Sequence, residues 1–160
     1  MSTEFVVNVT VDDVKKEKGS TYKGDFSYEQ TSGTPDIIDS KGNIDLKDVS
    51  GEADITFQWG SPEVTIDGQD YAASYYYGDQ TGLNIIIAEG KDSDPRTKGK
   101  NPPLSGDDEF TVDMAPTPAD FTLKDKNSDL KKYAYCMAAY VNVPGGGQII
   151  DDPKIYNRPD

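Results

Sequence analysis

The stretch Lys132-Tyr-Ala-Tyr-Cys-Met-Ala-Ala-Tyr-Val-Asn-Val143 is the last long apolar run of the chain, and Pro144 and Gly145-Gly146-Gly147 follow it. Read as a strand, it has mostly large residues at odd positions and small ones at even positions as far as Ala138. Both faces of such a strand can be buried, which is typical of a central position in a sheet. The pattern therefore predicts a central strand, with the glycines turning the chain into a short final strand.

A helix is the alternative interpretation of residues 130–143. Ser128 or Asp129 could cap its start, and Pro144 could end it. The residues that would share one helical face are Leu130, Tyr133, Ala134, Met137, Ala138 and Val141. The strand is favoured, because tyrosines are common in strands and the rest of the chain also has strand patterns.

Alternation of apolar and polar residues marks the other predicted strands. It is clearest at residues 4–12, 53–59 and 109–114, where one face of each strand would be buried. Shorter strands are predicted at residues 25–30, 36–48 (two strands around a turn), 64–66, 71–77, 83–88 and 121–123. Asp67-Gly68 is a strong hairpin signal. In the predicted turn at residues 39–43, Gly42 is free to take a positive φ.

Two segments lack a strand pattern. Residues 13–24 are polar and rich in lysine, which predicts a loop or a frayed helical turn. Residues 89–108 form a long irregular segment, and connections of that length in compact domains often carry function.

The number and spacing of these elements indicate the fold class. We count nine or ten short strands, with turn signals about every ten residues. The sequence therefore predicts an all-β, antiparallel β-sandwich with jelly-roll-like connections. The length of 160 residues and the even composition predict a single domain over residues 1–160.

The composition is strongly acidic. The net charge is -13, and 22 of the 29 acidic residues are aspartate, a common turn residue. Such a chain should repel nucleic acid and anionic membranes, so we expect neither as a partner. With one cysteine and no export signal at its start, the chain is predicted to reside in the cytoplasm.

The residue inventory argues against catalysis. The chain has no histidine, which removes the usual general base and most zinc, copper or haem sites. Cys136 lies among apolar residues and is expected to be a small buried hydrophobe. We therefore expect no enzymatic activity, although a glycosidase using two carboxylates would not need histidine.

Clustered carboxylates make calcium the best candidate for a cofactor. Hard cations prefer several oxygen ligands, and loops of this chain carry paired acids. The candidate ligands are Asp92, Asp94, Asp107 and Asp108. Asp39-x-x-x-Asn43-x-Asp45 and Asp151-Asp152 are further clusters, but none has EF-hand spacing, so ordinary turns are the alternative.

Aromatic residues mark the candidate ligand-binding surface. Trp59 and the run Tyr75-Tyr76-Tyr77 could stack on sugar rings if they are exposed. Trp59 shares its side of an alternating strand with Ile55 and Phe57, so core packing is the stronger interpretation for it. The tyrosine run alternates faces, so at least one tyrosine should approach solvent or a partner.

Three motifs occur in an order that resembles a bacterial family. They are the alternating strand Phe5-Val-Val-Asn-Val-Thr-Val11, the segment Asp-Ile-x-Phe-x-Trp at 54–59, and a terminal Tyr-rich strand, glycine turn and Asp-Pro-x-Ile at 152–155. In this order they resemble the AidA and PixA-type inclusion body proteins. The chain has Asp12-Asp13 where that family usually has Asp-Thr, and no Trp precedes its Asp-Pro.

The resemblance implies an intracellular bacterial β-sandwich protein without enzymatic activity that is sometimes stored as inclusions. It carries over no catalytic residue. The first hypothesis is thus a protein that acts by self-association or by binding a protein partner. The alternative is a calcium-dependent, lectin-like module that binds a glycan.

Overall fold

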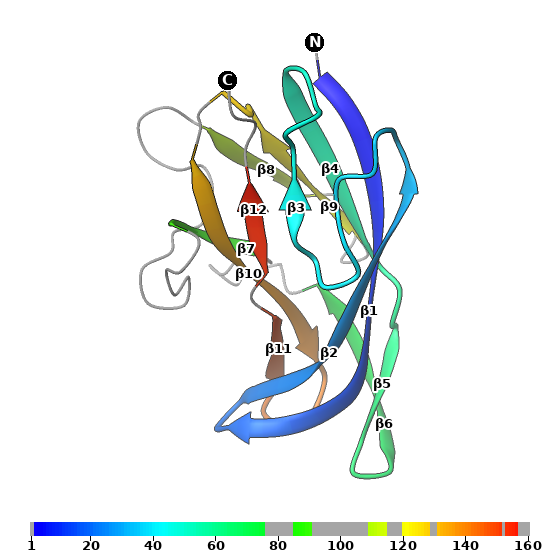
Figure 1. The fold of residues 1–160 in the computed structure, drawn as a ribbon. Helices are drawn as coiled ribbons and strands as arrows, with labels where there is room; N and C mark the ends of the chain where they lie inside the picture. The colour runs from blue at the N-terminus through cyan, green and yellow to red at the C-terminus, as the bar shows by residue number, and fades with distance from the viewer. Residues whose placement is uncertain are drawn as a thin grey trace.

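The computed structural model describes residues 2–75, 85–90, 109–114, 120–128, 131–151 and 153–156. These residues contain no helix, and their 12 strands join in one hydrogen-bonded network (Figure 1), which confirms the all-β prediction. The strands are β1 (Ser2–Lys18), β2 (Thr21–Ser32), β3 (Ile44–Asp45), β4 (Glu52–Trp59), β5 (Glu63–Ile66), β6 (Gln69–Tyr75), β7 (Ile85–Glu89), β8 (Phe110–Met114), β9 (Asp120–Asp125), β10 (Lys132–Val141), β11 (Gly147–Asp151) and β12 (Lys154–Tyr156).

The strands follow one long path with a side branch. The path runs β3-β12-β10-β11-β2-β1-β4-β9-β8, while β6 and β7 also pair with β10, and β5 pairs with β6. Most neighbours are antiparallel, as predicted, but β1–β4, β11–β2 and β12–β3 are parallel. Parallel neighbours need crossover connections, which turn signals in a sequence do not reveal. The sandwich with jelly-roll connections stays a prediction.

β10 occupies the centre of this network. Its first half pairs with both β7 and β12, and its second half pairs with both β6 and β11, so both of its edges have partners. Every residue from Tyr133 to Ala139 is buried, Cys136 included. The central strand predicted here is confirmed, and the helical alternative for residues 130–143 is wrong.

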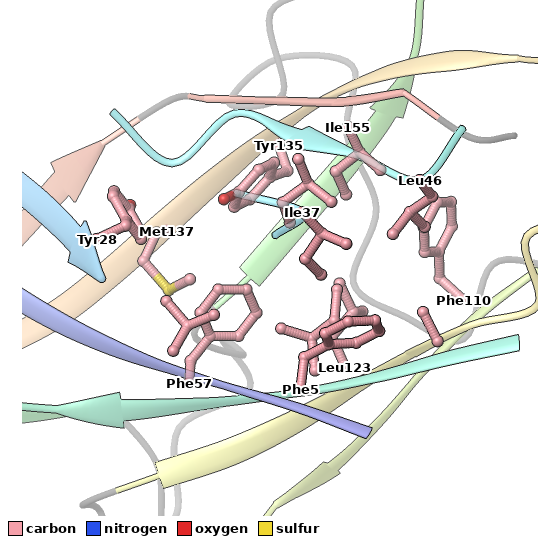
Figure 2. Close-up of a cluster of buried hydrophobic side chains, with 14 of the residues drawn as sticks. Phe5, Tyr28, Ile37, Leu46, Phe57, Phe110, Leu123, Tyr135, Met137 and Ile155 are labelled. Carbon is pink, nitrogen blue, oxygen red and sulfur yellow. The ribbon is translucent and has the colours of Figure 1, made fainter. Parts of the chain in front are cut away.

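The main core lies between β10 on one side and β1, β4 and β9 on the other. Figure 2 shows Phe5, Phe57 and Leu123, from β1, β4 and β9, pointing toward Tyr135 and Met137 of β10. All five side chains are fully buried. The alternation read from residues 4–12 and 53–59 therefore gives the buried faces correctly.

Two predicted turns form as the glycine chemistry requires. Asp67 and Gly68 join β5 to β6 with φ values of 51° and 80°, which is typical of a tight hairpin turn. Gly42 has a φ of 90° in the turn that follows Asp39. The Asp39 carboxylate accepts hydrogen bonds from the backbone N–H of Lys41 (3.0 Å) and of Asn43 (2.9 Å).

The segment 13–24 is strand where we predicted a loop or helical turn, so that prediction is wrong. β1 continues to Lys18 and β2 begins at Thr21, which makes a hairpin arm extending beyond the main core. The arm packs into a second buried cluster, in which Val14 and Tyr22 lie with residues of β5, β6, β10 and β11. Because tertiary packing stabilises these strands, the polar, lysine-rich local sequence was a poor guide.

Candidate functional site

One edge of β1 is paired over only part of its length. Along the other edge β1 pairs with β2 as far as Lys18, but on this edge the β4 ladder ends at the pair of Val9 and Trp59. Two further hydrogen bonds follow: Gly60 N–H donates to Val9 O (2.7 Å), and Val11 N–H donates to Ser61 Oγ (3.0 Å). Among the residues that the structure describes, no strand pairs with residues 12–16 on this side, which we term the open edge.

A groove lies between the open edge and β5. After Trp59 the chain continues to β5, which lies close to β1 but pairs with β6 and not with β1 (Figure 1). The resulting groove has a volume of about 560 Å³ and is lined by Val11, Asp12, Asp13, Val14, Glu63, Val64 and Thr65. The valines are buried and the other side chains are exposed, so the groove has an apolar base and an acidic rim.

A β-bulge shapes the open edge. Asp12 opposes Asp25 and Lys15 opposes Lys23, so two residues of β1 face the single residue Gly24 between these pairs. Asp13 takes up the extra residue with a φ of 52°, a conformation that aspartate tolerates better than most side chains. Bulges of this kind bend a strand and re-aim its side chains.

Gly24 makes room for the bulge. A Cβ built on Gly24 would lie 2.6 Å from Val11 Cγ2 and 3.3 Å from Val14 Cγ2, so both valines cover the same side of this glycine. Val11 and Val14 therefore lie on one face of the arm, although they are three positions apart in sequence. The bulge keeps both of them in the second buried cluster.

We expect Gly24→Ala to destabilise the protein by about 1–3 kcal/mol, because the added methyl group overpacks the contact with Val11. Urea unfolding followed by Trp59 fluorescence measures this. Ser27→Ala, at an exposed position of the same strand, is the matched control and should stay within about 0.5 kcal/mol of the wild type. Equal unfolding midpoints for the two variants would contradict the contact described here.

The aromatic residues predicted to bind a ligand are only partly within the described residues. Trp59 is half-buried at the end of β4, where it packs against both buried clusters, and its ring centroid lies 6.3 Å from that of Phe26. Tyr75 ends β6 and pairs with Ala139 through its backbone. Tyr76 and Tyr77 lie outside the described residues, so the tyrosine surface stays a prediction.

The predicted metal ligands Asp92, Asp94, Asp107 and Asp108 all lie outside the described residues. Within the described part of the chain, no group of three or more metal-ligating side chains comes together. The Asp39 cluster stabilises its own turn, and Asp151 Oδ2 accepts a hydrogen bond from the Tyr28 hydroxyl (2.9 Å).

Calcium binding by the four aspartates can be tested directly in solution. If they bind calcium in the native state, millimolar calcium should raise the melting temperature, because a ligand selective for the native state stabilises it. Differential scanning fluorimetry with calcium, and with magnesium as the control, measures this shift. An unchanged melting temperature in calcium would exclude the site.

The open edge was not identified from the sequence. The alternation of β1 is regular as far as Val11 and is then broken by Asp13, with Val14 buried one position later than a regular strand would place it. Val14 was the available signal, because a shift of the buried positions by one residue is typical of a β-bulge.

No family model and no curated protein matches the chain. Among solved structures it is similar to the crystal structure of the inclusion body protein PixA from Burkholderia cenocepacia J2315. The similarity covers 96% of each chain, with 8% sequence identity and a TM-score of 0.36. The sequence motifs at residues 5–11, 54–59 and 152–155 resemble the same family. Within the described ranges, no helix is long and apolar enough to cross a membrane.

Proposed function

We propose that the protein is a non-enzymatic β-sandwich protein that acts by self-association through its strand edges. The observation that supports this most is the open edge of β1, residues 12–16, beside an open groove. The backbone N–H and C=O groups along an unpaired edge are a template for pairing with another chain. The absence of histidine, the usual general base, agrees with a role in assembly.

Net charge sets the conditions for association. Two copies that each carry a net charge of -13 repel one another over long distances at low ionic strength. At physiological ionic strength the Debye length falls to about 8 Å, which screens this repulsion far more than contacts between touching side chains. We therefore expect association to become stronger as salt is raised from low to physiological levels.

Sedimentation velocity tests this proposal directly. We expect the weight-average sedimentation coefficient to rise with protein concentration at physiological salt and to rise less in low salt. A sedimentation coefficient that is that of a monomer at every concentration and salt level would contradict the proposal.

A further inference from the structure

The outer part of the β1–β2 arm is basic, although the chain as a whole is acidic. Residues 14–24 contain four lysines and one glutamate, a net charge of +3, which leaves -16 for the rest of a chain whose net charge is -13. Within the part of the chain that the structure describes, no ion pair involves any of these lysines. All four are exposed, and we term them the basic tip: Lys15, Lys16, Lys18 and Lys23.

The basic tip holds two of its lysines against each other. Lys15 opposes Lys23 across the two strands, so their side chains share one face of the arm. Like charges directly opposite each other on neighbouring strands are destabilising. Asp12 opposes Asp25 at the base of the arm, on the other side of the bulge. An anionic group that approaches the tip from outside would therefore relieve the repulsion between Lys15 and Lys23.

The hairpin formed by β5 and β6 carries the opposite charge. Residues 48–90 contain eight acidic residues and no lysine or arginine. Three of the eight, Glu63, Asp67 and Asp70, are exposed on this hairpin, and we term them the acidic hairpin. The Thr65 hydroxyl donates a hydrogen bond to Asp70 Oδ1, which orients that carboxylate. The hairpin thus presents carboxylates with no cation of its own to neutralise them.

The basic tip and the acidic hairpin project at the same end of the molecule. Figure 1 shows the β1–β2 arm and the β5–β6 hairpin at its lower end, with their turns apart. The two hairpins meet nearer the core, where Val14 and Val64 lie in the second buried cluster. No ion pair joins the lysines of the tip to the carboxylates of the hairpin within one chain. The two charged surfaces are therefore complementary but do not neutralise each other in a single molecule.

We propose that two copies of the chain form a symmetric dimer in which the basic tip of each contacts the acidic hairpin of the other. The partner is a second copy because it presents, at one end, both of the charges that the contact needs. A two-fold axis at this end makes the two contacts together, as an isologous interface requires. This rests on the proposed function and names the surfaces that self-association uses. Lys15 and Lys16 belong to the open edge of β1, so the contact covers that edge.

Two double charge reversals test the contact. Lys15→Glu/Lys18→Glu reverses the charge of the tip, and Glu63→Lys/Asp70→Lys reverses the charge of the hairpin. Each replaces attraction by repulsion at both symmetric contacts, so each should raise the dimer dissociation constant about tenfold or more. Lys15→Glu also places an opposite charge against Lys23, so it should not destabilise the arm. Melting temperatures close to that of the wild type would show that both variants fold.

Charge complementation supplies the decisive readout. In an equal mixture of the two variants, the acidic tip of one meets the basic hairpin of the other, and the second contact is native, so association should return to the wild-type level. The quadruple variant with both reversals keeps the net charge of -13 and should recover self-association by itself. The controls Lys41→Glu/Lys47→Glu and Glu29→Lys/Asp36→Lys make the same changes in net charge at exposed positions outside both surfaces.

Sedimentation equilibrium of these proteins gives separable outcomes. Weakened double variants with a restored mixture and a restored quadruple variant would support the dimer. If the wild type associates but the double variants associate equally well, or the mixture stays weak, the contact is wrong and self-association uses another surface. If the wild type is strictly monomeric, both the dimer and the proposed function are wrong. Retention of that monomer on heparin, lost in Lys15→Glu/Lys18→Glu, would then assign the basic tip to a different polyanion.

Discussion

Phe57→Ala is expected to lower the free energy of unfolding by about 3–5 kcal/mol, because it deletes a large side chain from a core that cannot close over the gap. Phe57 is fully buried on β4, and its ring centroid lies 5.4 Å from that of Phe121 on the neighbouring strand. Figure 2 shows it facing Met137 of β10. The loss is large beside the total stability of about 5–15 kcal/mol that is typical of a folded domain.

Urea unfolding measures this loss, with the fluorescence of Trp59, the single tryptophan, as the signal. Phe57→Leu is the matched control, since it keeps most of the volume and should cost less than half as much. A Phe57→Ala variant with a midpoint close to that of the wild type would mean that β4 and β10 do not enclose a packed core.

Gly42→Ala is expected to destabilise the protein by about 2–5 kcal/mol, the sum of backbone strain at a positive φ and a steric clash. Gly42 has a φ of 90°, and a Cβ on it would lie 2.5 Å from Tyr28 Cε1. The Tyr28 ring cannot move aside easily, because its hydroxyl donates to Asp151 Oδ2 at 2.9 Å. The carbonyl of Gly42 also accepts a hydrogen bond from the Tyr135 hydroxyl, so any shift of the turn disturbs the core.

Gly68→Ala separates the two causes. Gly68 has a similar φ of 80°, but a Cβ built there would have nothing within 4 Å. Only the backbone strain of alanine at a positive φ should remain, which lowers the free energy of unfolding by about 1–3 kcal/mol. If the two alanine variants unfold at the same urea concentration, the contact between the Gly42 turn and Tyr28 does not constrain the fold.

The sequence was most informative where one local rule decided the structure. Small and large residues alternate in β10, which indicated a strand buried on both faces. Asp67-Gly68 correctly predicted the hairpin turn between β5 and β6. It was least informative where distant packing decided. Residues 13–24 look like a loop, yet Val14 and Tyr22 bury enough surface in the second cluster to extend both strands.

Pairing between distant strands was also beyond the sequence. β1 lies beside β4 in parallel, with Phe5 opposite Ile55 and Val7 opposite Phe57. Alternation identified both buried faces but could not show that they adjoin. For the same reason the sequence did not reveal the open edge, which became a candidate surface only because the β1–β4 ladder ends at Val9 and Trp59.

Hydrogen exchange at two protein concentrations tests the central claim most directly, since it reports on the backbone amides of the open edge themselves. Residues 12–16 should take up deuterium quickly in dilute solution and become protected at high concentration, when another copy of the chain covers this edge. The turn at residues 39–43 lies outside the proposed contact and should exchange equally at both concentrations. Exchange at residues 12–16 that does not change while the protein associates would contradict the account.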